Sequence, residues 1–341
     1  MKKNSKPTEE HLIELYDAAA AFKKAEPWKW LYDSDIISVE NPKDKTMAYC
    51  SVMGRAGEHY ALGVYLGTEG LYGFNELLEN GDNIPLDQAL HLQNCLMCSF
   101  EDRNQLTNQD REQIKELGLS FRGRNAWPLF RRHEPGYYPW FITDEECIFL
   151  IHALKQTLIA ANHVLNGQLR MNAKQGKIIG RYSEEKDGKL EWFSKEVLLE
   201  IPTVTYKPVI ISDEMLIQKL KNSTRMGNNS LQTDISYMNS AVQDIKGERP
   251  YYPRVFFLVD QNSGIILDFK MFKSISDDVN ITLNRLSSML IKNGLPKEIQ
   301  VRSEEMASIL VDLCEKIGIK LKLVNKLPAI EQVLEKMPDG Y

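Results

Sequence analysis

The sequence has few cysteines, no long apolar run and no excess of basic residues. Its 341 residues include five cysteines spread from Cys50 to Cys314, unlike the even, closely spaced set of a disulfide framework. No segment approaches the roughly 18 apolar residues that a transmembrane helix needs. The charged start at Met1–Lys3 is not followed by an apolar stretch of signal-peptide length. We therefore expect a protein of the reducing cytoplasm with no membrane partner.

The charge balance is slightly acidic, with 42 Lys and Arg against 47 Asp and Glu and a net charge of -5. This balance argues against a protein whose entire surface binds nucleic acid or anionic membranes, but it does not exclude a local basic patch. With 43% hydrophobic and 26% charged residues, the chain has the composition of a globular protein. Its length predicts two domains.

The first part, residues 1–170, is predicted to be an α+β domain. Thr8 caps an amphipathic helix that ends before Pro27, and a capping box at Thr143 and Glu146 opens a second long helix. Between them, apolar alternation predicts strands, and 3.6-residue periodicity predicts helices. The strands are 35–41, 47–53, 59–67 and 95–101, and the helices are 69–80, 86–94 and 108–117. The glycines of 54–57 and 63–73 are interpreted as turns around strands, and 118–142 as a long loop.

Residues 171–230 are predicted to be a hairpin and connecting region. The dipeptide Asp187-Gly188 between two apolar runs is typical of a two-residue hairpin turn. A helix is predicted over 213–221.

The last part, 231–341, is predicted to be an α/β domain with the element order βββαβαβα in one mixed sheet. The periodicity places strands at 231–238, 254–260, 265–272, 299–302 and 319–324, with helices at 277–293, from Met306 to Ile317 and at 329–336.

The segments Leu231–Tyr237, Val255–Asp260 and Asn262–Leu267 resemble the opening of the catalytic core of retroviral integrases and transposases. The passage from Gly294 to Glu304 is similar to a later helix-to-strand passage of that core. The resemblance covers about residues 231–337 and implies a ribonuclease-H-like fold.

The resemblance also implies a chemistry, phosphoryl transfer by two Mg²⁺ or Mn²⁺ ions held by three carboxylates. Carried over by position, the carboxylates are Asp234, Glu304 and, on the last helix, Glu331, with Glu335 as another candidate. Glutamate stands at 304 where the family has aspartate, and the asparagine-rich segment that the family has before the third acid is absent, with Lys326 in its place. Residues 254–341 contain 12 basic and 12 acidic residues, so they lack the net positive charge that grips phosphates.

Two functions follow from these observations. The leading hypothesis is a non-catalytic binding or interaction module without a cofactor. The alternative is a metal-dependent phosphoryl transferase or nuclease that uses Asp234, Glu304 and Glu331.

The whole chain also resembles a family of uncharacterised bacterial proteins with two parts. The motifs that carry this resemblance are Trp127-Pro128-x-Phe130-Arg131, Pro135–Trp140 and Arg249–Arg254. The resemblance implies no activity.

The segment 118–142 has four arginines against Glu134 alone, a local charge of 4 minus 1, or +3, and is rich in aromatic residues. Planar guanidinium groups beside aromatic rings suit a base, a phosphate or a carboxylate. We take Arg131, Arg132, Tyr137 and Trp140 as candidate contacts to an anionic ligand, nucleic acid included. The alternative is that these side chains anchor the segment by burial.

Other sequence features indicate no chemistry. Cys95 and Cys98 have the spacing of half a zinc site, but no second Cys/His pair completes it, so structural thiols on opposite faces of a strand are predicted. The six histidines show no metal-binding spacing, and no glycine-rich phosphate loop is present.

Overall fold

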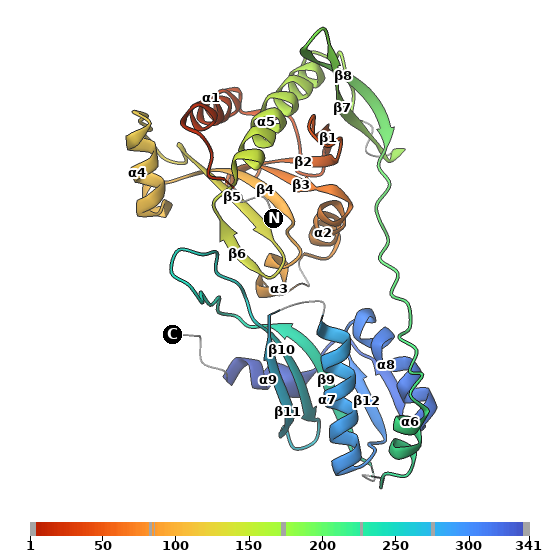
Figure 1. The fold of residues 1–341 in the computed structure, drawn as a ribbon. Coiled ribbons are helices and arrows are strands. Elements are labelled where there is room, and N and C mark those ends of the chain that lie inside the picture. The colour runs from red at the N-terminus through yellow and green to blue at the C-terminus, as the bar shows by residue number, and fades with distance from the viewer. Residues whose placement is uncertain are drawn as a thin grey trace. The chain divides into compact units, whose positions relative to one another are not determined.

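The computed structural model describes residues 5–81, 84, 86–171, 175–225, 228–273 and 277–336. The chain divides into two compact units, Met1–Thr203 and Val204–Tyr341, each with helices packed on a mixed sheet (Figure 1). The predicted α+β and α/β character is therefore confirmed at this level. Residues 171–230 are shared, since their hairpin joins the sheet of the first unit and their helix belongs to the second.

The first unit is built on an eight-stranded sheet with the order β6-β5-β4-β3-β2-β1-β7-β8. β1 and β7 are parallel, and the other neighbours are antiparallel. The strands are β1 (Ile37–Glu40), β2 (Met47–Met53), β3 (Tyr60–Leu66), β4 (Cys95–Glu101), β5 (Trp127–Glu134), β6 (Tyr137–Trp140), β7 (Lys177–Lys186) and β8 (Lys189–Leu198).

Helices α1 (Glu9–Ala25) and α5 (Asp144–Leu165) pack together on one face of this sheet. Both begin as predicted, because Thr8 and Thr143 accept hydrogen bonds from the backbone amides of His11 and Glu146. By length and composition, α5 is the described helix that could cross a membrane, but half of that stretch is buried. Its packing against α1 and four strands is that of a core helix.

Helix α2 (Gly67–Asn80) covers the opposite face, where Phe74 packs with Tyr65 and Cys95. The other α-helices among the described residues of this unit are the short α3 (Leu86–Leu90) and α4 (Asn108–Glu116). The helix predicted over 86–94 is thus shorter than expected.

The loop prediction for 118–142 is wrong over its second half, which forms the hairpin β5–β6 at the edge of the sheet. The prolines of this segment led to the loop prediction, because proline is rare inside strands. Pro128 lies where β5 has β4 but not β6 beside it, and Pro139 lies on the edge strand. Neither position requires a second ladder hydrogen bond, so proline is tolerated at both.

The interpretation of Gly63–Gly73 as turns is also wrong. Gly63 lies within β3, and Gly67, Gly70 and Gly73 lie in α2. An ideal Cβ on Gly73 would lie 1.8 Å from the carbonyl oxygen of Leu92, and one on Gly70 would lie 2.7 Å from that of Asn94. These glycines let the helix approach the neighbouring backbone more closely than a side chain permits.

Replacing Gly73 by alanine should destabilise the first unit by about 1 to 3 kcal/mol or more, because the backbone at Leu92 must move. Urea unfolding measures the change. The matched control is Gly81→Ala, where no atom lies within 4 Å and φ is -52°. It should be neutral or stabilise by up to about 1 kcal/mol. Equal effects of the two changes would contradict the close-approach explanation.

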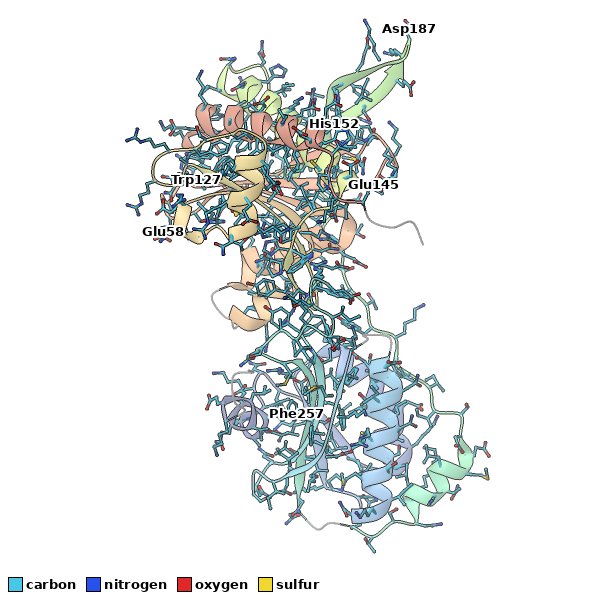
Figure 2. The ribbon with its side chains drawn as sticks, turned by 60° about the vertical axis from the view of Figure 1, so that its left-hand side comes forward. Glu58, Trp127, Glu145, His152, Asp187 and Phe257 are labelled. Carbon is cyan, nitrogen blue, oxygen red and sulfur yellow. The ribbon has the colours of Figure 1, made fainter. Side chains whose placement is uncertain are left out.

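The hairpin prediction at Asp187-Gly188 is confirmed. β7 and β8 pair from Lys177–Leu198 to Lys186–Lys189, and Asp187 lies at the tip (Figure 2). Both turn residues have positive φ, 51° and 72°, as a two-residue hairpin of this kind requires.

The second unit has a five-stranded sheet with the order β11-β10-β9-β12-β13. Strands β9, β12 and β13 are parallel, and β10 is antiparallel to both neighbours. The strands are β9 (Ser230–Tyr237), β10 (Arg254–Asp260), β11 (Ile266–Phe272), β12 (Glu298–Val301) and β13 (Lys320–Leu323), and the helices are α6 (Glu214–Lys221), α7 (Asp278–Asn293), α8 (Glu304–Ile317) and α9 (Pro328–Lys336). The predicted order βββαβαβα from residue 231 is confirmed.

Helices α6, α7 and α8 cover one face of this sheet, and α9 covers part of the other. All seven residues of β10 are buried, because its side chains alternate between the two cores. Phe256 and Leu258 belong to the larger core, whereas Phe257, labelled in Figure 2, packs toward α9.

Candidate functional site

The carboxyl ends of β9 and β12 lie at the same edge of the second sheet, since the two strands are parallel neighbours. In open α/β sheets, ligands commonly bind beside this edge. Asp234 and Ser236 come from β9, and Arg302 directly follows β12. This edge also contains Asp234 and Glu304, two of the predicted metal-binding carboxylates.

Asp234 is buried and forms an ion pair with Arg302. Its Oδ2 lies 2.7 Å from Arg302 Nη2 and accepts a hydrogen bond of 2.7 Å from the Ser236 hydroxyl. Arg302 Nη2 also donates to the Ser236 hydroxyl at 2.8 Å. Burial raises the pKa of Asp234, and the guanidinium and hydroxyl groups offset this effect only in part. The polar groups of this triad therefore satisfy one another.

A second ion pair lies on the opposite face of the sheet, at the start of β10. Arg254 Nε donates to Asp278 Oδ1 at 3.1 Å, and the guanidinium lies 4.7 Å from the ring centroid of Tyr237. Burial raises the pKa of Asp278 despite this partner. The two arginines of this edge are thus both paired with buried aspartates.

The structure does not bring Asp234, Glu304 and Glu331 together as a metal site. Glu304 is exposed in the first turn of α8, which Ser303 caps, and Glu331 on α9 accepts a hydrogen bond of 3.4 Å from the Leu327 amide. Among the described residues, no group of three or more His, Cys, Asp or Glu side chains could hold a metal ion. The donor set at this edge does not fit Mg²⁺ or Mn²⁺, because the Asp234 carboxylate is turned to a guanidinium.

Sequence reasoning missed Arg302, the residue that decides the character of this edge. The signal for it was its position, directly before the cap Ser303 and at the end of a strand beside the one that carries Asp234.

Arg131, predicted to contact an anion, is instead bound to Asp110 at the start of α4. Its Nη1 and Nη2 donate to the two carboxylate oxygens at 2.9 and 2.6 Å. Burial alone would raise the pKa of Asp110, but hydrogen bonds from Arg131 and Thr107 and the charge of Arg131 lower it below its usual value. The pair joins α4 to strand β5.

Arg132 has internal partners as well. Its Nε lies 3.2 Å from Glu146 Oε1, and its Nη2 donates to the Asn94 side chain at 2.7 Å. Trp140 is half-buried against Phe141, and Tyr137 is exposed on β6. The arginine contacts therefore support the anchoring alternative for this segment, while Tyr137 lies at the surface.

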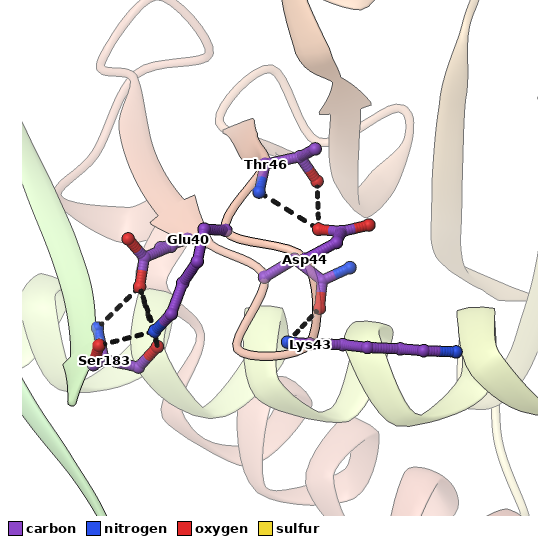
Figure 3. A network of polar contacts seen from close by, with 7 residues as sticks. Glu40, Lys43, Asp44, Thr46 and Ser183 are labelled. Atoms are coloured by element: carbon purple, nitrogen blue, oxygen red, sulfur yellow. Dashed lines mark hydrogen bonds and ion pairs between the residues drawn. The ribbon is translucent and has the colours of Figure 1, made fainter. Parts of the chain in front are cut away.

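An open hollow of about 580 Å³ lies beside the β7–β8 hairpin. On its polar side, Lys45 Nζ donates to Glu40 and to the Ser183 carbonyl. Glu40 also accepts a hydrogen bond from the Ser183 hydroxyl, and both residues are labelled in Figure 3. A stacked pair, Tyr182 and Phe193, completes the lining. Because its lysines are paired with glutamates, the hollow offers no concentrated charge to a ligand.

Cys95 and Cys98 are buried thiols on opposite faces of a strand, as predicted. All five cysteines are free and buried. Cys95 and Cys98 belong to cores on opposite faces of β4, and burial raises the pKa of Cys95 to about 12. A thiol with so high a pKa is a poor nucleophile or metal ligand at neutral pH.

The chain is similar to two families, one in each unit. Residues 13–181 match the model of a domain of unknown function (DUF7309), and residues 216–338 match the model of a second domain of unknown function (DUF6930). No curated protein matches the chain. The comparisons agree with a protein of two domains and name no activity.

Replacing Arg131 by alanine should lower the free energy of unfolding by about 3 to 5 kcal/mol, because it leaves the buried Asp110 carboxylate without its partner. Arg122→Ala, an exposed arginine of the same predicted loop, is the control and should change stability by no more than about 0.5 kcal/mol. Denaturant unfolding of both variants measures the difference. A small change in the free energy of unfolding on Arg131→Ala would contradict the anchoring role and favour Arg131 as a contact to an anionic ligand.

The Asp110 pair should also make stability depend on pH. Because the folded-state pKa of Asp110 is depressed, its contribution is complete above the unfolded-state value of about 3.9 and is lost as pH falls through the folded-state value. The stability difference between the wild type and Asp110→Asn should therefore shrink as the pH is lowered below about 4. A difference that grows on acidification would show that the pKa is not depressed.

Proposed function

We propose that the second unit is a ribonuclease-H-like domain that has lost the metal chemistry of the fold and acts as a binding or interaction module. The sequence resemblance over 231–337, the element order βββαβαβα and the mixed sheet support this fold. Because a fold alone does not imply an activity, the function must be argued from the side chains at the edge of the sheet.

The ion pair between Asp234 and Arg302 is the observation that carries the proposal. Two-metal catalysis requires clustered carboxylates that turn toward an open, solvated cation site. Here the aspartate of the first strand is buried, and a guanidinium supplies the positive charge that a metal ion would supply. Arg302 is a residue of the chain, so its positive charge is always present beside Asp234. Unlike a metal ion, a guanidinium has no open coordination position for a substrate or water.

Charge favours a protein partner over a nucleic acid for this module. Residues 254–341 carry 12 basic and 12 acidic residues, and both arginines at the candidate edge are paired internally. Binding to nucleic acid draws most of its affinity from unpaired positive charge. The free, buried cysteines support the further proposal that the protein works in a reducing cytoplasm.

A metal titration combined with a mutant cycle tests this function. Millimolar Mn²⁺ should leave the Tm of the wild type unchanged, because an ion that binds only the folded state would raise it. Arg302→Ala should cost about 3 to 5 kcal/mol, because it leaves a buried carboxylate unpaired, and adding Asp234→Asn should recover part of that loss.

Glu304→Gln is the matched control, since Glu304 is exposed and belongs to the alternative metal site. It should change neither Tm nor the response to Mn²⁺. A rise in the Tm of the wild type with Mn²⁺ that disappears in Asp234→Asn and Glu304→Gln would overturn the proposal in favour of metal-dependent catalysis.

A further inference from the structure

Strand β11 forms one edge of the second sheet and exposes apolar side chains. Ile266, Phe269 and Met271 are 41%, 52% and 49% exposed. They lie opposite Val259, Phe257 and Val255 of β10 and so share the face on which α9 packs. Because α9 covers β9 and β10, the β11 part of this face stays open in the second unit.

The other sheet edges carry features that discourage pairing with another chain, such as proline, lysine and short length. β6 contains Pro139, and β13 has only four residues, of which Lys320 and Lys322 are exposed. β8 is lined with charged residues, namely Lys189, Glu191, Lys195 and Glu196. β11 has seven residues and a single lysine. It is therefore the edge best suited to accept another strand.

The charge pattern of β11 fits a second copy of itself. When two identical strands pair in antiparallel fashion about a two-fold axis, one residue faces itself. With Phe269 on the axis, Asp268 of each copy faces Lys270 of the other. Moving the axis to Asp268 or Lys270 places two like charges opposite each other, which is unfavourable. Of these three registers, the sequence of the strand favours the one centred on Phe269.

We propose that two copies of the chain associate through β11, so that their five-stranded sheets continue into each other with Phe269 on the two-fold axis. Arg285 holds Asp268 in place and also donates to the Phe269 carbonyl at 2.9 Å. That carbonyl keeps a second lone pair for an amide of the other copy. Two seven-residue strands bury less than the roughly 1,200 Å² of a standard interface, so the dimer should be weak, with a Kd in the micromolar range. This inference is independent of the proposed function, because a metal-binding domain could pair in the same way.

Cysteine crosslinking of the full chain tests the register. Phe269→Cys should give a disulfide-linked dimer under mild oxidation, since opposite Cβ atoms in an antiparallel pair are about 4.5 to 5.5 Å apart. The native cysteines are buried and should contribute little background. Met271→Cys should crosslink poorly, because the two sulfurs would be four residues, or about 13 Å, apart along the strands. Leu323→Cys, also 52% exposed but on β13, is the control and should not crosslink.

Sedimentation provides a second measurement that needs no new thiol. Lys270→Glu places a carboxylate opposite Asp268 in both halves of the interface, so the dimer Kd of this variant should rise at least roughly tenfold. Lys322→Glu on β13 should leave the Kd unchanged. A wild type that stays monomeric up to about 0.5 mM overturns the proposal, since an interface weaker than this provides little specific binding energy. Equal crosslinking at residues 269 and 323 overturns it as well.

Discussion

A carboxylate taken out of water needs a positive charge or hydrogen-bond donors, and three buried carboxylates that pair with an arginine join other elements of the protein to its sheets. Asp110, Asp234 and Asp278 are all buried, and their partners are Arg131, Arg302 and Arg254. Arg131 connects β5 to the start of α4, and Arg254 connects β10 to the start of α7. Breaking such a pair costs far more than forming it gains, so each pair fixes geometry more than it adds stability.

The same constraint limits what these arginines can do for a ligand. A guanidinium that satisfies a buried carboxylate cannot leave it without exposing an unpaired charge. The cationic segment 118–142 therefore loses two of its four charges, Arg131 and Arg132, to the interior. At the carboxyl ends of β9 and β12, Arg302 likewise neutralises Asp234, the first of the acids that the resemblance to integrases had suggested for metal binding.

Local patterns predicted most of the secondary structure, because periodicity, capping boxes and turn dipeptides act between residues close in sequence. The elements after residue 231 and the Asp187-Gly188 hairpin were found in this way. The pairing of Asp234 with Arg302, 68 positions later, was not, because it depends on which strands become neighbours. Likewise, the need for Gly73 in α2 could not be predicted, because it depends on the close approach of the helix to the backbone of Leu92 in the folded unit.

The parallel pairing of β1 with β7 has a consequence for the order in which the first unit is built. Ile37 lies beside Ile179. The edge of β1 that faces away from β2 therefore has no neighbouring strand until more than a hundred further residues have been synthesised. At ribosomal rates of about 5 to 20 residues per second, that interval is on the order of ten seconds. During it, a strand with three buried residues presents an unpaired edge to the cell. The family match from 13 to 181 ends within β7, the strand that closes this edge.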